Sequence, residues 1–163
     1  MNAIIIAAGS GRRISTEARN TPKSMVKVNG KSIIEYQLSV LNKVGISEVY
    51  VITGPYSEKF TIKNVKYVKD LEFEKHDILG SLMEAKKFFK KDTLILYSDI
   101  IFEFKIIEKI MKSKENISIA VDMNWEKNYE GRTERPKLEA ENVEIKNDRD
   151  IIQIRKNIEN VKN

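Results

Sequence analysis

Short apolar runs alternate with amphipathic segments along most of the chain. Residues 2–8 (NAIIIAA), 49–53 (VYVIT) and 93–98 (TLILYS) are runs rich in isoleucine, leucine and valine. Such runs are typical of strands that are buried on both faces, as in a parallel sheet. The same pattern predicts two further strands, a weaker one at 65–68 and another at 117–121.

The segments between these runs carry the signals of helices. Residues 32–35 (SIIE) and 81–84 (SLME) match the capping box, in which a serine and the glutamate three residues later satisfy the first backbone N–H groups. Gly45 is placed to end the first of these helices. Apolar residues at helical spacing within 106–111 (IIEKIM) predict a third helix. The alternation of strands and helices predicts an α/β fold with a largely parallel sheet.

The pattern changes after Asp122. Residues 125–136 are polar and irregular, and residues 137–145 alternate like an exposed strand. Residues 148–150 (DRD) are typical of a turn, and they lead into another apolar stretch at 151–154. No internal repeat or low-complexity linker separates this part from the preceding one.

Composition and charge indicate a globular domain. The 163 residues fit one domain, and 41% of them are hydrophobic and 33% charged. The 29 Lys and Arg against 24 Asp and Glu give a net charge of +5, which suits a phosphate-bearing ligand or RNA and selects neither. The chain has no cysteine and one histidine, His76, which excludes a disulfide framework, a cysteine nucleophile and a multi-histidine metal site. The apolar run at 3–8 is too short to span a bilayer and follows no basic leader, so we expect a soluble, cytoplasmic domain.

A loop of glycine and arginine, residues 9–13 (GSGRR), follows the first predicted strand directly. Without a Cβ atom in the way, backbone N–H groups can approach phosphate oxygens closely. The dinucleotide-binding pattern does not match, because Ile14 stands where it requires its third glycine. The P-loop pattern does not match either, because Met25 stands where it requires a glycine. Arg13 and Lys23 could hold a triphosphate from such a loop. A surface loop with solvated arginines is the alternative, and the spacing alone leaves both open.

Asp99 stands at the carboxyl end of the predicted strand 93–98. In open α/β sheets, ligands bind at that end of the strands. Mg²⁺ takes carboxylate oxygens together with substrate phosphates, so one or two aspartates can suffice. The alternative is that Asp99 only caps the helix that follows.

The residues at 3–13 (AIIIAAGSGRR), 22–25 (PKSM) and 28–31 (VNGK) together resemble the start of the nucleotidyltransferase superfamily, which makes nucleoside-diphosphate sugars and related head groups from an NTP. The resemblance implies a Rossmann-like three-layer sandwich with a mostly parallel sheet. It implies that Arg13 and Lys23 are the catalytic residues at the phosphates and that Asp99 binds Mg²⁺. The nucleotide-binding residues that it implies are Ala7, Ala8, Gly9, Ser10, Gly11, Arg12, Asp77 and Ser81.

Two positions depart from the family pattern. Ala18 stands where the family often has a threonine. His76-Asp77 stands where family members have an asparagine-bearing loop near the base, before a Ser-Leu helix. Asp77 in place of the asparagine keeps a hydrogen-bond acceptor and loses the amide donor. His76 by itself is expected to be a surface or capping residue.

A further series at 121–125 (VDMNW), Tyr129, Arg132, Pro136 and 139–141 (EAE) resembles the branch that transfers CMP to phosphocholine, 2-aminoethylphosphonate and related acceptors. The resemblance implies that the acceptor is bound by Asp122, Trp125, Tyr129 and Lys156. Aromatic faces and carboxylates can hold an ammonium group, and a lysine can hold its phosphate. The alternative is that Trp125 is an ordinary core or lid anchor and that the acidic residues form a solvated face.

These observations lead to one functional hypothesis with stated alternatives. We expect a single domain over 1–163, with a nucleotide-binding core at 1–122 and a partial acceptor-binding part at 123–163. It would transfer CMP from CTP to a phosphorylated amine or phosphonate with Mg²⁺ as cofactor, releasing pyrophosphate. Its partners would be CTP and a small phospho-acceptor, with no nucleic acid or membrane, and a homodimer stays open. A sugar-1-phosphate nucleotidyltransferase is one alternative. Family members continue beyond the end of this chain, so a truncated nucleotide-binding module without turnover is another.

Overall fold

The computed structural model describes residues 1–9, 21–131, 140–147 and 149–156. The chain forms two compact units, Met1–Lys114 and Glu115–Asn163, each of which is described by itself.

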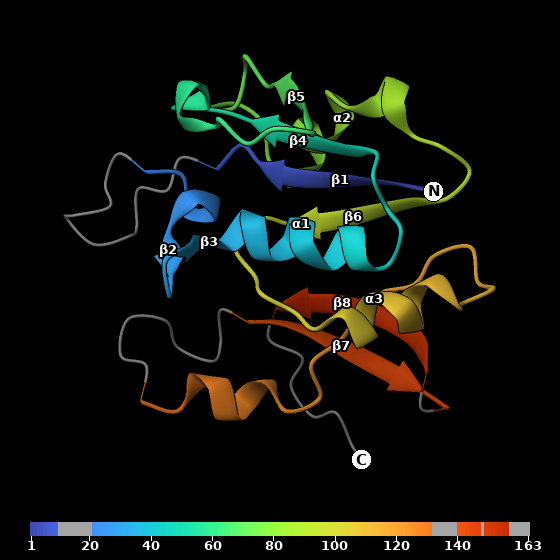
Figure 1. Cartoon of the computed structure of the whole chain (residues 1–163). Coiled ribbons are helices and arrows are strands. Elements are labelled where there is room, and N and C mark those ends of the chain that lie inside the picture. The colour runs from blue at the N-terminus through green and yellow to red at the C-terminus, as the bar shows by residue number, and fades with distance from the viewer. Residues whose placement is uncertain (10–20, 132–139, 148, 157–163) are drawn as a thin grey trace. The chain divides into compact units, whose positions relative to one another are not determined.

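A four-stranded parallel sheet forms the centre of the first unit (Figure 1). The strand order is β5-β4-β1-β6, so the N-terminal strand lies inside the sheet. Ile5 of β1 pairs with Val51 on one side and with Leu96 on the other. The strands are β1 (Asn2–Ala7), β4 (Val49–Thr53), β5 (Lys66–Lys69) and β6 (Thr93–Tyr97). The strands predicted at 2–8, 49–53, 65–68 and 93–98 are thereby confirmed.

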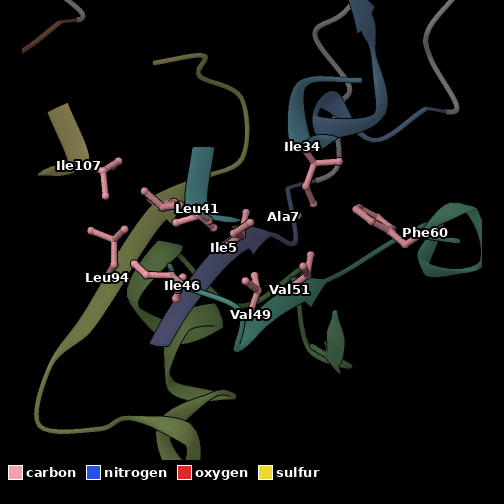
Figure 2. Packing of buried hydrophobic residues seen from close by; sticks show 12 residues of the cluster. Ile5, Ala7, Ile34, Leu41, Ile46, Val49, Val51, Phe60, Leu94 and Ile107 are labelled. Atoms are coloured by element: carbon pink, nitrogen blue, oxygen red, sulfur yellow. The ribbon is translucent and has the colours of Figure 1, made fainter. Parts of the chain in front are cut away.

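Helices cover both faces of this sheet. Residues 3, 5 and 7 of β1 join a core cluster with Leu41 of α1 and Ile107 of α3, as Figure 2 shows for its labelled side chains. Ile4 of β1 belongs to a second cluster that includes Leu82 of α2. Alternate residues of one buried strand therefore serve two layers, which confirms the predicted three-layer α/β sandwich. The helices are α1 (Ile33–Lys43), α2 (Ile78–Met83) and α3 (Phe104–Met111).

The capping box at the start of α1 is confirmed. The backbone N–H and the hydroxyl of Ser32 both donate to the Glu35 carboxylate, and these bonds lower the pKa of Glu35 below its ordinary value. Gly45, at φ +81°, follows the helix end in the left-handed region that glycine adopts without strain.

The second predicted capping box is wrong. Helix α2 begins at Ile78, and its N-cap is Asp77, whose carboxylate accepts a hydrogen bond of 2.7 Å from the Gly80 N–H. Ser81 lies inside this helix, where it is buried and donates to Asp70 at 2.7 Å. An aspartate is as good an N-cap as a serine, so the earlier aspartate begins the helix and frees Ser81 for a tertiary bond.

Short elements connect the main ones. A tight hairpin precedes α1, and its turn residues Asn29 and Gly30 have φ values of +50° and +80°. The hairpin strands are β2 (Lys27–Val28) and β3 (Lys31–Ser32), and the 3₁₀ turns of this unit are η2 (Lys23–Met25), η3 (Ser57–Lys59) and η4 (Lys86–Phe88).

The second unit contains η5 (Trp125–Tyr129) and an antiparallel pair of strands, β7 (Glu141–Lys146) and β8 (Asp150–Lys156). The strand predicted at 117–121 is wrong, because the structure gives these residues no strand. Within the described parts of this unit, β7 and β8 pair only with each other, and the 117–121 backbone joins neither of them. Ile117 is accordingly 83% exposed. Among the helices described in either unit, none is long and apolar enough to cross a membrane.

A charged cluster lies at the amino ends of the sheet strands. The Glu48 carboxylate accepts hydrogen bonds from Lys90 and from the Tyr50 hydroxyl, the latter at 2.8 Å, and Lys66 lies 3.5 Å away. The bond from Lys90, followed by that from Tyr50, lowers the pKa of Glu48 from 4.5 to about 2. Tyr50 also stacks on Phe88, with ring centroids 4.2 Å apart. This cluster ties the start of β4 to the chain that enters β6.

We expect Glu48→Gln to destabilise the protein near neutral pH and to lose that effect in acid. Because the folded pKa of Glu48 is about 2 against an ordinary 4.5, its contribution is complete above 4.5 and disappears as the pH falls toward 2. Thermal unfolding of the wild type and the variant between these limits measures the difference. The exposed Glu58, changed to glutamine, is the control. A Tm difference that stays constant with pH would contradict the assignment.

Candidate functional site

A lysine and an aspartate meet at the carboxyl edge of the parallel sheet. Lys23 Nζ donates to Asp99 Oδ2 at 3.3 Å, although the two residues are 76 positions apart. Their side chains are 32% and 45% exposed, so both can be reached from solvent. The structure therefore brings together two residues that the sequence singled out for different reasons, one for phosphate and one for metal.

Helix α1 holds the segment that carries Asp99. Gln37 is 1% exposed, and its Nε2 donates to the carbonyl oxygens of Tyr97 and Ile100, both at 2.7 Å. Tyr97 and Ile100 lie on either side of Asp99 in the sequence, so these two bonds hold the turn after β6 that carries Asp99. Nothing in the sequence pointed to Gln37, because a polar residue on an amphipathic helix is usually exposed.

Asp99 does not cap the following helix. The N-cap of α3 is Glu103, four residues further along. The structural alternative for Asp99 is therefore excluded, and its carboxylate faces Lys23 instead.

Short backbone bonds fix Lys23 on the other side of the pair. The Met25 N–H donates to the Pro22 carbonyl at 2.8 Å, and the Val26 N–H donates to the Lys23 carbonyl at 3.1 Å. Ser24 between them is 1% exposed. Lys23 thus projects from a turn that is anchored by a buried neighbour.

The end of β1 lies against the loop after β4. A Cβ atom added to Gly54 would lie 2.3 Å from the Ala8 carbonyl oxygen, so only glycine fits there. Ala7 and Ala8 are each 4% exposed, whereas an added Cβ at Gly9 would have nothing within 4 Å. Among the described residues, none therefore packs against Gly9, where the buried strand ends. The predicted residues Ser10, Gly11, Arg12 and Arg13 lie outside the described residues.

A buried carboxylate organises the turn between β5 and α2. The side chain of Asp70 is 0% exposed, and its two oxygens accept hydrogen bonds from the Glu72 N–H at 3.0 Å and the Ser81 hydroxyl at 2.7 Å. The Nδ1 atom of His76 lies 3.0 Å from Asp70 Oδ1. His76 is thus part of a buried network and not the surface or capping residue that we expected. The sequence held no signal for Asp70, because its side-chain partners His76 and Ser81 lie six and eleven residues further along the chain.

Among the described residues, one group of three side chains has metal-binding atoms within 4.8 Å of one another: Asp70, His76 and Glu84. Both Asp70 oxygens already accept hydrogen bonds within the protein. Among the described residues, Asp99 belongs to no such group.

The predicted acceptor residues lie in the second unit. The Asp122 carboxylate accepts from the Asn124 N–H and from Asn128 Nδ2, both at 2.9 Å. The rings of Trp125 and Tyr129 meet edge to face, with centroids 5.4 Å apart. Lys156 is exposed, and it lies opposite Glu141 in the backbone register of the antiparallel strands β7 and β8. Arg132, Pro136 and Glu139 of the same predicted series lie outside the described residues.

Comparison with known proteins gives a family for the chain. Residues 3–129 match the family model described as "MobA-like NTP transferase domain". The chain is 32% identical over 160 residues to the CTP:phosphoglutamine cytidylyltransferase of Campylobacter jejuni, a match that covers 90% of this chain and 62% of that protein. It is 35% identical over 133 residues to a bifunctional sugar-1-phosphate nucleotidylyltransferase/acetyltransferase of Sulfurisphaera tokodaii, covering 79% of this chain and 32% of that one. The chain thus matches about three fifths of the first relative and one third of the second.

Solved structures agree with this result. The CTP:phosphocholine cytidylyltransferase from Streptococcus pneumoniae superposes with a TM-score of 0.58 at 30% identity, over 64% of this chain and 49% of that one. The inositol-1-phosphate CTP transferase from T. maritima superposes with a TM-score of 0.71 at 16% identity, over 98% of this chain and 65% of that one. The second likeness supports the Rossmann-like fold.

We expect the Lys23–Asp99 pair to contribute little to stability, in contrast to Gln37. Both members of the pair are partly exposed, so Asp99→Asn should change the free energy of unfolding by less than about 1 kcal/mol. Gln37→Met should cost about 1–3 kcal/mol, because two carbonyl groups lose their donors. Urea unfolding of both variants measures this contrast. A larger cost for Asp99→Asn than for Gln37→Met would make Asp99 a structural residue.

Proposed function

Since the chain belongs to the MobA-like NTP transferase family, we propose that it is a Mg²⁺-dependent cytidylyltransferase that transfers CMP from CTP to a phosphorylated amine or phosphonate. The observation that carries this proposal is the contact between Lys23 and Asp99 at the carboxyl edge of the sheet. This contact puts an ammonium and a carboxylate within 3.3 Å of each other, which suits a site for phosphate and a metal ion.

The contact fits a site that binds a metal–phosphate complex. Without substrate, the ammonium and the carboxylate neutralise each other. When Mg²⁺–CTP binds, Asp99 would hold the metal and Lys23 would turn to the phosphates, so each charge exchanges one partner for another. Mg²⁺ would neutralise charge on the phosphates. The exposure of both side chains leaves room for this exchange.

The reaction itself needs positioning and charge stabilisation. An oxygen of the acceptor's phosphate or phosphonate attacks the α-phosphorus of CTP, a new P–O bond forms, and the bond to the departing pyrophosphate breaks. Lys23 would stabilise negative charge on the phosphates during this exchange, together with Arg13 of the glycine–arginine loop. Ala7, Ala8 and the open backbone at Gly9 would border the nucleotide.

The acceptor proposal rests on the second unit and on the named relatives. Trp125 and Tyr129 form a half-buried ring pair, and the exposed carboxylate of Asp122 belongs to the same short segment. Ring faces and a carboxylate suit an ammonium group, and the exposed Lys156 suits its phosphate. The Campylobacter and Streptococcus proteins are named for phosphoglutamine and phosphocholine, which are both phosphorylated nitrogen compounds.

A sugar-1-phosphate nucleotidyltransferase is the second candidate. It is supported by the Sulfurisphaera relative, whose match extends over 79% of this chain. A sugar phosphate carries no cation, so it would gain nothing from the ring pair and the carboxylate at Asp122. The choice of acceptor therefore separates the two candidates.

We expect Lys23→Ala to weaken the binding of Mg²⁺–CTP by about 1.5–3 kcal/mol, the range of a charge-assisted hydrogen bond. Calorimetric titration with and without Mg²⁺ measures the loss. Lys27→Ala, which removes an exposed lysine from the neighbouring hairpin, is the matched control and should bind CTP as the wild type does. Asp99→Asn should abolish the difference between the two titrations. Wild-type affinity in the Lys23 variant would remove this residue from the site.

We expect pyrophosphate release from CTP to be faster with phosphocholine or 2-aminoethylphosphonate than with glucose 1-phosphate. Trp125→Ala should raise the KM for the amine acceptor and leave the affinity for CTP nearly unchanged, because the ring would contact only the ammonium group. Phe89→Ala removes an exposed ring from the first unit and serves as the control. Faster turnover with glucose 1-phosphate would favour the sugar enzyme. CTP binding without turnover of any acceptor would identify a binding module.

A further inference from the structure

The buried Asp70 carboxylate determines which nitrogen of His76 carries a hydrogen. Asp70 Oδ1 accepts a hydrogen bond from the Glu72 backbone N–H at 3.0 Å, and Oδ2 accepts from the Ser81 hydroxyl at 2.7 Å. Because both Asp70 oxygens act as acceptors, the donor at the 3.0 Å contact is His76 Nδ1. In the neutral ring, Nε2 therefore carries a lone pair and acts as a hydrogen-bond acceptor.

The imidazole ring is also fixed by packing. A Cβ atom added to Gly80 would lie 3.0 Å from His76 Cβ, Cγ and Cδ2, so the side chain rests directly on the backbone of α2. The His76 side chain is 23% exposed, which leaves part of the ring accessible. A ring that is held by Asp70 and supported by Gly80 presents its acceptor in one orientation.

This ring belongs to a turn that is joined to the predicted nucleotide site. The Asp70 N–H donates to the carbonyl of Thr53, the last residue of β4, at 2.8 Å. Thr53 pairs with Ala7 at the end of β1. Ala8 and Leu82 of α2 share one core cluster. The turn from 70 to 77 is thus connected on both sides to the end of β1, where the base would lie.

Two carboxylates lie near His76, and both already have partners. Asp77, the next residue, accepts from the Gly80 N–H at 2.7 Å, and Glu72, whose oxygen lies 3.9 Å from His76 Nε2, is paired with Lys75 at 2.8 Å. Cytosine presents a 4-amino donor at the edge where uracil and thymine present the O4 acceptor. A lone pair at Nε2 attracts the amino group and repels the oxygen.

We propose that His76 is a specificity-determining residue that accepts a hydrogen bond from the 4-amino group of cytosine through Nε2, and so selects CTP over UTP and TTP. This inference rests on the proposed nucleotide transfer and adds to it the physical basis of base selection. It gives the lone histidine of the chain a role that depends on the buried Asp70.

The test removes the amino group from the ligand and the acceptor from the protein. Affinities of the full chain for CTP, UTP and the triphosphate of 2-pyrimidinone riboside, which is CTP without its amino group, are measured with Mg²⁺ at about pH 8.5, where imidazole is generally neutral. The wild type should bind CTP about tenfold more tightly than either analogue. His76→Asn keeps an amide N–H for Asp70 and loses Nε2. The affinity of this variant for CTP should therefore fall to its affinity for the 2-pyrimidinone analogue, and the affinity for the analogue should stay unchanged.

Glu74→Gln is the matched control, because it alters an exposed carboxylate of the same turn and leaves His76 and Asp70 intact. It should keep the preference for CTP. An unchanged preference in His76→Asn, or a loss in Glu74→Gln as large as that in His76→Asn, would overturn the proposal. Equal wild-type binding of CTP and its analogues would overturn the inference and leave nucleotide binding intact. A wild type that binds no nucleoside triphosphate would instead refute the proposed function.

Discussion

The parallel pairing of β1 with β4 on one side and with β6 on the other is the constraint on which the rest of the structure depends. Because all three strands run in the same direction, their carboxyl ends meet at one edge of the sheet. The open backbone at Gly9, the Thr53 carbonyl that anchors the Asp70 turn and the aspartate after β6 all lie at this edge. The apolar side chains of β1 make this possible by filling the layers above and below the sheet.

Polar groups at this edge fall into two kinds. Gln37 and Asp70 are buried, bonded to neighbouring segments, and hold those segments in place. Lys23 and Asp99 are partly exposed and bonded to each other, so they can exchange partners at low cost. Buried groups of the first kind keep a site in shape, whereas exposed charges of the second kind are available to a ligand. Stability and the proposed binding are therefore carried by different residues.

Much of the first unit follows from local pattern. The runs at 2–8, 49–53 and 93–98 form strands because a parallel sheet buries their apolar side chains on both of its faces. The Ser32–Glu35 capping box forms because both of its partners lie within one helical turn. The same kind of signal failed at 81–84, since a capping box competes with any tertiary partner of its serine, and Asp70 is such a partner.

The sequence by itself determined the strands and helices of the sandwich, and it singled out Lys23 as a candidate phosphate ligand and Asp99 as a candidate metal ligand. Only the tertiary structure decided that these two charges meet across 76 residues, that 117–121 finds no strand to pair with among the described residues, and that Asp70 fixes His76. The reason is physical. Propensity, capping and periodicity act within one or two turns of the chain, whereas a hydrogen bond between distant segments exists only once the sheet has brought them together.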